Sequence, residues 1–122
     1  MLQFLLVVAG GAIGAASRFV VYNLSMRWLS LSFPSATLIV NVSGSFIGGL
    51  LVAWISHHSR LSSELRAFLL VGILGAFTTF STFSLDTIKL LQQQHFVSAG
   101  LNVVLNLILS LAAVYVGMLV VE

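Results

Sequence analysis

The 122-residue chain has no cysteine and very few charged residues. Without cysteine it can form no disulfide, no thiolate nucleophile and no cysteine-ligated metal site. Charged residues make up 7% of the chain, whereas a typical soluble domain has about 25%. The five Lys and Arg residues form no basic run, so the sequence offers no electrostatic footprint for nucleic acid. Most of the candidate functional groups must therefore be uncharged.

Hydrophobic residues make up 59% of the sequence, and in water they would leave large exposed apolar patches. A bilayer covers such a surface, and a membrane-spanning helix needs about 20 mostly apolar residues. Four stretches qualify, over about residues 2–22, 34–55, 64–91 and 97–121. No Lys or Arg precedes the first, so we expect a retained helix rather than a cleaved secretion signal. The sequence predicts one all-α domain of four transmembrane helices over residues 1–122, in the inner or plasma membrane of the cell.

The charges that flank these spans are almost evenly divided between the two sides of the membrane. Arg60 and Arg66 would lie on the side of the termini, and Arg27 and Lys89 on the other side, with Arg18 close by. Lys and Arg in short loops set the orientation of a membrane protein, so this balance predicts insertion in both directions. Two opposed copies could then pair as an antiparallel, dual-topology homodimer. The alternative is that one arginine fixes a single orientation.

Small residues also recur at the spacing that lets membrane helices approach closely. Gly10 and Gly14 are four residues apart in the first span, as are Gly44 and Gly48 in the second. This GxxxG spacing is typical of tight helix–helix contacts in membranes. The contacts could lie within one subunit or between two.

Two of the spans carry uncharged polar residues at four-residue intervals, which places each set on one helical face. They are Thr37, Asn41 and Ser45 in the second span, and Asn102, Asn106 and Ser110 in the fourth. Their N–H and O–H groups could solvate an anion without trapping it behind a formal charge. The same side chains could instead hydrogen-bond between helices, as they often do in membranes.

Two glycines and a cluster of Thr and Ser interrupt the third span, which reads GILGAFTTFSTFS from Gly72 to Ser84. Glycine weakens a helix, and Ser and Thr compete for backbone hydrogen bonds or cap a new helix. We therefore expect a break between Gly75 and Thr79, although an unbroken helix with its Ser and Thr bonded to the preceding turn is the alternative. Freed carbonyls at such a break can hold a cation. Backbone donors at the start of the second half favour an anion.

Phenylalanines recur every three residues in the same segment, at Phe77, Phe80 and Phe83. The edge of an aromatic ring carries partial positive charge, so rings presented edge-on can stabilise an anion that has lost its water. Packing or lipid contact is the alternative explanation of this spacing.

Two segments, GILGAFTTFSTF at Gly72–Phe83 and TLIVNVSGSFIGG at Thr37–Gly49, closely resemble the Fluc, or CrcB, family of fluoride channels. The glycine-rich first span, which ends in Ser17–Phe19, resembles the family as well, so the resemblance covers essentially the whole chain. It implies a passive, fluoride-selective channel that exports fluoride from the cytoplasm. It also implies an antiparallel homodimer with two pores.

The resemblance further implies roles for particular residues. Phe80 and Phe83 would offer ring edges to fluoride, Asn41 an amide and Ser110 a hydroxyl, with Ser81 and Thr82 near the path. Arg18 would raise the potential for anions at the entrance. The backbone carbonyls of Gly75 and Thr78 would bind a structural sodium ion at the centre of the dimer. The polar residues at four-residue intervals in the second and fourth spans add Thr37 and Asn106 as candidates for this pathway.

Two rival functions share some of these features. A proton-coupled small multidrug exporter is also short, has four spans and inserts in both orientations, but it depends on a glutamate in the first span, where this chain has no acid. A non-transporting subunit of a larger membrane assembly would use the polar stripes and GxxxG pairs as partner contacts.

An enzyme is not expected, because the histidines have neither metal-ligand nor catalytic-dyad spacing with a membrane carboxylate. His57, His58 and His95 are read as residues of interfacial loops. Asp86, the acid closest to the third span, could lie at a helix end or pair with a nearby cation.

Overall fold

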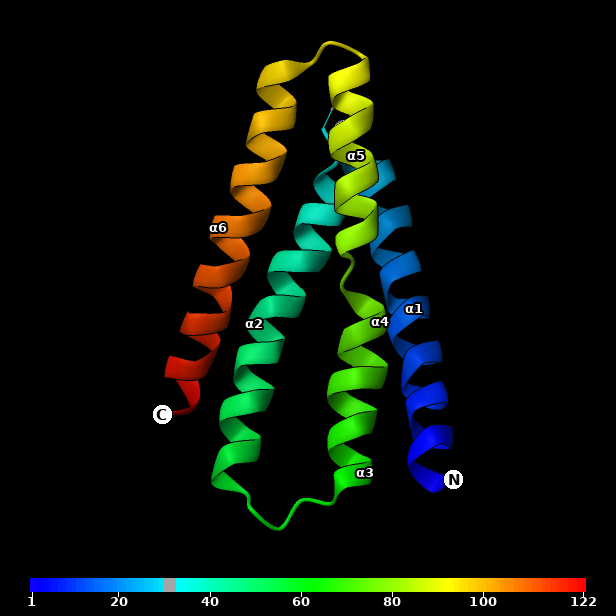
Figure 1. Ribbon diagram of the computed structural model, residues 1–122, viewed down its shortest axis with the longest axis vertical. Coiled ribbons are helices and arrows are strands. Elements are labelled where there is room, and N and C mark those ends of the chain that lie inside the picture. The colour runs from blue at the N-terminus through cyan, green and yellow to red at the C-terminus, as the bar shows by residue number, and fades with distance from the viewer. Residues whose placement is uncertain (30–32) are drawn as a thin grey trace.

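The computed structural model describes residues 1–29 and 33–122, and nearly all of these residues are helical (Figure 1). The elements in chain order are α1 (Leu2–Trp28), α2 (Ser35–His57), α3 (Ser63–Arg66), the π-helical segment η1 (Ala67–Leu74), α4 (Gly75–Phe77), α5 (Phe80–Gln92) and α6 (Phe96–Val121). Within the described residues, four helical stretches are long and apolar enough to cross a membrane, over Leu2–Trp28, Ser35–His57, Ser63–Gln92 and Phe96–Val121. The prediction of an all-α protein with four membrane-spanning helices is confirmed.

The first helix is longer than its apolar segment suggests. It continues to Trp28, past the expected end near Tyr22, because polar residues such as Asn23 and Arg27 extend a helix beyond its hydrophobic part without breaking it. Part of the expected connection to the second span, residues 30–32, lies outside the described residues.

The helices run up and down, so the two termini lie toward the same end of the molecule as the connection between α2 and α3 (Figure 1). The turn between α5 and α6 lies at the opposite end. That turn is tight because Gln94 adopts a left-handed conformation with φ of 60° and the His95 N–H donates to the Leu90 carbonyl at 2.8 Å. It folds α6 back along the molecule.

The glycines of the GxxxG pairs make contacts within this single chain. A Cβ added to Gly10 would lie 2.6 Å from the Phe68 carbonyl oxygen, and one added to Gly14 would clash with the Ile73 carbonyl oxygen. A Cβ on Gly44 would clash with the Thr78 side chain. These glycines thus make contacts within one subunit and let α1 and α2 approach the third span closely.

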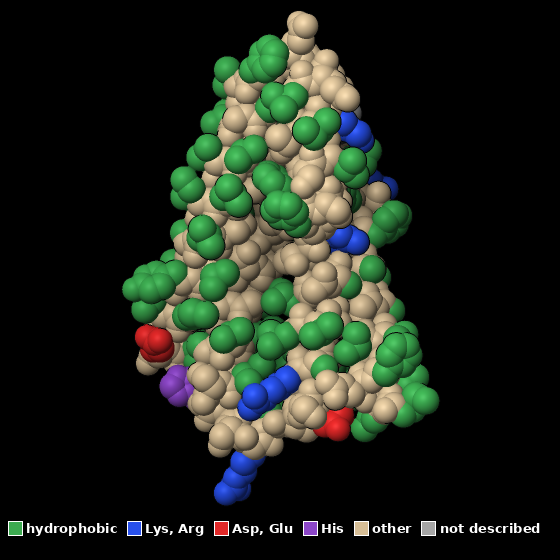
Figure 2. Space-filling model, viewed as in Figure 1, with side chains coloured by type: hydrophobic (Ala, Val, Ile, Leu, Met, Phe, Trp, Pro, Cys, Tyr) green, Lys and Arg blue, Asp and Glu red, His purple; other side chains and the backbone are tan. Residues whose placement is uncertain are grey.

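Most large apolar side chains lie on the outside of the subunit, where Figure 2 shows them spread over the visible face. The most fully buried large side chains are instead Val40, Asn102 and Thr37. A chain with an apolar exterior and a partly polar interior is suited to lipid rather than to water. The polar interior is where the candidate site lies.

Candidate functional site

Two extended residues separate α4 from α5. Thr78 has φ −82° and ψ 158°, and Thr79 has φ −152° and ψ 117°. Threonine hydroxyls bond to the backbone on both sides: Thr78 Oγ1 donates to the Leu74 carbonyl at 3.1 Å beside the Thr78 N–H, and Thr79 Oγ1 accepts from the Thr82 N–H at 3.1 Å. The second bond is an N-cap, which satisfies a donor of the first turn of α5.

The extended residues leave backbone carbonyls without helical partners. In a continuous helix the Gly75 carbonyl would accept from the Thr79 N–H, but that N–H donates to a side chain of α2. Across the described residues, the carbonyls of Gly75 and Thr78 accept no hydrogen bond from another part of the chain. Gly75 is also exposed. These oxygens are free to bind a ligand that carries positive charge.

Asn41 of α2 bonds to both backbone groups of Thr79. Its Oδ1 accepts from the Thr79 N–H at 2.9 Å, and its Nδ2 donates to the Thr79 carbonyl at 3.0 Å. The second Nδ2 hydrogen goes to Asn106 Oδ1 at 3.1 Å, so both N–H groups of Asn41 have protein acceptors.

The bond to Asn106 begins a chain of hydrogen bonds that joins α2, α6 and α5. Asn106 Nδ2 donates to the Asn102 carbonyl and Oδ1 at 2.8 and 2.9 Å, and Asn102 Nδ2 donates to Thr87 Oγ1 at 2.9 Å. Thr87 donates in turn to the Phe83 carbonyl at 2.8 Å. Thr87 was missed by sequence reasoning, although it lies one turn after Phe83 on the same face of α5.

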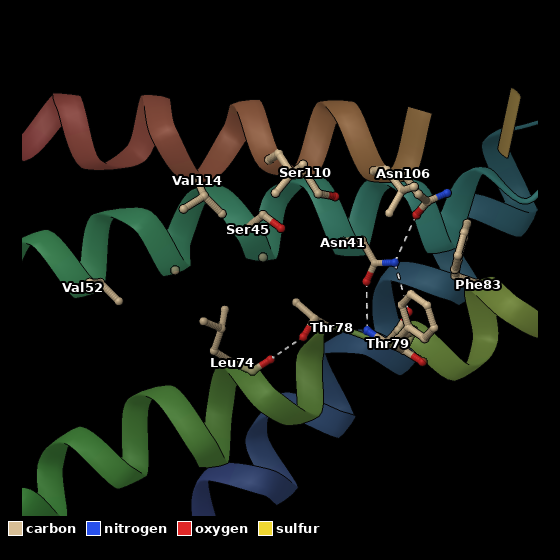
Figure 3. A pocket seen from close by; sticks show the side chains of 15 residues that line it. Asn41, Ser45, Val52, Leu74, Thr78, Thr79, Phe83, Asn106, Ser110 and Val114 are labelled. Carbon is tan, nitrogen blue, oxygen red and sulfur yellow. Dashed lines mark hydrogen bonds between the residues drawn. The ribbon is translucent and has the colours of Figure 1, made fainter. Parts of the chain in front are cut away.

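A cavity of about 510 Å³ lies beside this network, between α2, α6 and the extended residues. Figure 3 shows Asn41, Thr79, Phe83 and Asn106 at one end of it and Val52, Leu74 and Val114 toward the other, with Ser45 and Ser110 between. None of the described residues that line the cavity is ionisable. The cavity thus has an uncharged polar end and an apolar end.

Ser110 of α6 lines this cavity and carries a hydroxyl without a protein partner in the described chain. Its Oγ is buried and has no hydrogen-bond partner among the described residues. An unsatisfied buried hydroxyl is unfavourable by about 1–3 kcal/mol and usually has a specific explanation. A ligand that accepts a hydrogen bond inside the cavity would supply the missing partner.

Phe80 and Phe83 both line the cavity but differ in exposure. The Phe83 side chain is 8% exposed and lies close to Asn41, whereas the Phe80 side chain is 72% exposed on the surface of the subunit. Their ring centroids are 5.3 Å apart and their planes are tilted by 54°. The rings therefore form one pair that extends from the cavity to the surface.

Thr37 belongs to a second cluster, away from the large cavity. Its hydroxyl donates to Asp86 Oδ2 at 2.7 Å and therefore accepts from the Tyr22 hydroxyl, also at 2.7 Å. These three residues line a smaller cavity of about 170 Å³. Asp86 thus lies within α5 with a hydroxyl partner on α2, which is neither of the two positions considered from the sequence.

The remaining predicted residues lie outside the two cavities. Ser81 and Thr82 bond to Thr79 Oγ1 at 3.2 and 3.1 Å and so stabilise the start of α5. Arg18, on α1, lines neither cavity. Of the predicted pathway residues, the structure brings Asn41, Phe80, Phe83, Asn106 and Ser110 to the large cavity.

The fold and this site define a small multi-pass membrane protein with an uncharged polar cavity between its helices. The chain belongs to the family described as "CrcB-like protein, Camphor Resistance (CrcB)", which matches residues 5–118. The family resemblance seen in the sequence is therefore confirmed.

Curated relatives of this chain carry the name "Fluoride-specific ion channel FluC". One from Shewanella amazonensis is 50% identical over 117 residues, which cover 96% of this chain and 94% of the relative. One from Aeromonas salmonicida is 51% identical over 118 residues, with coverages of 97% and 94%. A third, from Methylococcus capsulatus, is 48% identical over 116 residues, and the chain spans 51% of that longer relative.

Proposed function

We propose that this chain is a passive, fluoride-selective channel that lets fluoride leave the cytoplasm across the inner membrane. The observation that carries the proposal is the large cavity, whose polar end is lined by uncharged groups in a chain 50% and 51% identical to two proteins named fluoride-specific ion channels. Conduction requires sites that attract an ion and still release it. Neutral donors meet this requirement better than a formal positive charge would.

The proposed pathway passes along the polar end of the cavity. Fluoride is small and strongly hydrated, so entry requires protein dipoles that replace its water. The unpartnered Ser110 hydroxyl and the ring edges of Phe80 and Phe83 would supply them, beside a wall formed by Asn41 and Asn106. If the assembled pathway is narrow at these groups, the larger chloride ion would be solvated there less well than fluoride.

Other predicted residues would act before or beside this space. Thr37 would lie on the pathway through its own smaller cavity, next to Tyr22 and Asp86. Ser81 and Thr82 would fix the first turn of α5 near the path. Arg18 would raise the local anion concentration near an entrance, an effect that weakens with salt.

We further propose that two oppositely inserted copies form the channel. The Phe80 side chain is 72% exposed in a single copy although it lines the cavity, so a second copy would complete the wall on that side. The balanced flanking charges support insertion in both orientations. Each channel unit would then contain two equivalent pathways.

The interruption at Thr78 and Thr79 would lie at membrane depth and hold a structural sodium ion between the copies. Backbone carbonyls of unwound helices bind Na⁺ in other membrane proteins, and the carbonyls of Gly75 and Thr78 lack hydrogen bonds from the described residues. Irregular backbone at this depth is tolerated only where it is buried in protein or lines a cavity. When bound, the ion would supply positive charge that holds carbonyls of both copies together.

The names of the relatives favour neither rival function, and they describe channels rather than enzymes. The first span lacks the acid that a proton-coupled exporter would need, since Arg18 is its only charged residue before Tyr22.

The direct test uses the purified protein alone in sealed lipid vesicles loaded with fluoride. An ion-selective electrode should record fluoride release down its gradient, without any proton gradient, while vesicles loaded with chloride retain it. Protein-free vesicles provide the control. Release that requires a proton gradient would favour an exporter, and no release of either ion would favour a non-transporting subunit.

A further inference from the structure

The backbone of Thr79 needs partners from outside its own helix. Thr79 is extended and only 6% exposed, so its N–H and carbonyl can be satisfied neither by a helical neighbour nor by bulk water. Buried backbone groups are nearly always hydrogen-bonded. Here both bonds come from one side chain, Asn41 of α2.

A primary amide can pair with a peptide in this way because it carries an acceptor and a donor side by side. The two bonds, 2.9 and 3.0 Å long, resemble those that a neighbouring β-strand would make to an extended residue. An aspartate could accept from the Thr79 N–H but could not donate to its carbonyl. Alanine could do neither.

The same bonds leave Asn41 without a spare donor. Its second N–H is bound to Asn106 Oδ1, and the two N–H groups of Asn106 are bound to Asn102. Among the buried side-chain donors of the cavity in the described residues, the one without a protein acceptor is the Ser110 hydroxyl. With both N–H groups and its oxygen bonded to protein, the Asn41 amide is placed to hold the backbone of Thr79.

We infer that Asn41 is a positioning residue, whose amide holds Thr79 extended and so sets the separation between the carbonyl end of α4 and the Phe80–Phe83 ring pair of α5. The importance of this separation for conduction rests on the proposed function, but the separation itself can be measured without fluoride. If the two threonines became helical, each would shorten the segment by about 1.8 Å, because an extended residue rises about 3.3 Å and a helical one 1.5 Å.

The experiment measures a distance across the extended residues. The chain has no cysteine, so two introduced cysteines can carry spin labels at Val71 of η1 and Leu85 of α5, which are 62% and 60% exposed. Double electron–electron resonance is recorded in liposomes, with labelled protein diluted by unlabelled protein to suppress distances between copies. The parent should give one narrow distance distribution. Asn41→Ala should shift it about 3–4 Å shorter or broaden it by that amount.

Two further variants make the outcome specific. Asn106→Leu removes the neighbouring amide at similar volume but leaves both bonds to Thr79, so it should keep the parent distance. Asn41→Asp keeps the size of the side chain but cannot donate to the Thr79 carbonyl, so it should broaden the distance distribution. This variant provides the test if the alanine variant fails to fold. Fluoride release from the same samples should fall at least tenfold with Asn41→Ala. An unchanged distance in Asn41→Ala and Asn41→Asp, or an equal shift in Asn106→Leu, would overturn the inference even where fluoride release falls.

Discussion

Phe80 and Phe83 are identical side chains three residues apart, but they differ in burial and in surroundings. Phe83 is buried beside the polar end of the cavity, and its ring is held in place by surrounding protein. Phe80 is largely exposed, so it contributes little to the stability of a single subunit. An exposed ring at the margin of a polar cavity can contact lipid, a ligand or a second copy.

Replacing Phe80 should therefore impair conduction and spare the fold. Phe80→Ile keeps an apolar side chain but removes the ring edge, and a loss of about 1.4 kcal/mol of stabilisation at the limiting barrier slows passage tenfold. We expect fluoride release from vesicles to fall about tenfold or more, with unchanged size-exclusion behaviour.

The matched control for this experiment is Phe4→Ile. Phe4, on α1, is 67% exposed and lines neither cavity, so its replacement should leave fluoride release at the parent rate. Equal rates for all three proteins would remove the ring-edge contact from the proposed pathway.

A substitution at Ser110 should change fluoride transport without lowering the thermal stability of the protein. Its buried hydroxyl has no partner in the described chain, so Ser110→Ala removes an unsatisfied polar group and should leave the melting temperature unchanged or raise it. Fluoride release should nevertheless fall, because the cavity loses a donor. Thermal unfolding in detergent and electrode recordings measure the two effects, and a large drop in melting temperature would show that the hydroxyl has a structural partner instead.

The polar side chains of the cavity were predictable from sequence as a set, but their bonds were not. Four-residue spacing placed Asn41 with Thr37 and Asn106 with Ser110, since helical periodicity determines which residues share a face. It could not show that Thr37 bonds to Asp86 and Tyr22 while Asn41 bonds to Thr79, because such pairing depends on the distances between helices.

At the scale of elements, the close approach of α2 and α6 depends on glycines of both helices. A Cβ added to Gly49 would clash with the Val114 carbonyl oxygen, and one added to Gly117 would clash with the Phe46 carbonyl oxygen. The backbones thus touch without intervening side chains, which brings Asn41 and Asn106 within hydrogen-bond distance. The geometry of the polar network is a consequence of this packing.

Two alanine substitutions on α6 test this dependence. Gly117→Ala should destabilise the subunit by about 1–3 kcal/mol, the usual effect of overpacking a tight contact. Gly100→Ala, on the same helix, places its methyl group in open space and should be neutral or slightly stabilising. Unfolding in detergent by increasing sodium dodecyl sulfate compares them, and equal effects would mean that the α2–α6 contact tolerates a wider separation.

Sequence reasoning located the four spans because long apolar segments in a short chain leave few alternatives. It did not anticipate the π-helical segment η1, whose residues Ala67–Leu74 read as an ordinary apolar helix. It also left open where the glycine pairs make contact, because spacing alone cannot distinguish a contact within a subunit from one between subunits.

At the scale of the whole molecule, the arrangement of charges bears on the proposed antiparallel pairing. Arg60 and Arg66 flank the end that carries the termini, whereas Arg27 and Lys89 flank the other end, and all four side chains are exposed. Neutralising them should therefore change the orientation of insertion without disturbing the packed interior. Charge-neutralising variants therefore test the orientation of insertion independently of folding.

Two complementary variants make the test. The first, Arg60→Gln with Arg66→Gln, leaves positive charge on one side, and the second, Arg27→Gln with Lys89→Gln, leaves it mainly on the other. Each variant alone should insert largely in one orientation, which labelling of a single cysteine at the exposed loop residue Ser59 with a membrane-impermeant reagent can measure. The parent should be labelled in about half of its copies, as equal insertion in both directions requires.

If two opposed copies are needed, cells that express either biased variant alone should retain fluoride, whereas cells that express both should release it at close to the parent rate. The reason is that an antiparallel pair has two-fold symmetry, so a population with one orientation supplies only half of each interface. Full release by either variant alone, with its single orientation verified by the cysteine label, would contradict antiparallel pairing and leave a channel formed by parallel copies or by one chain.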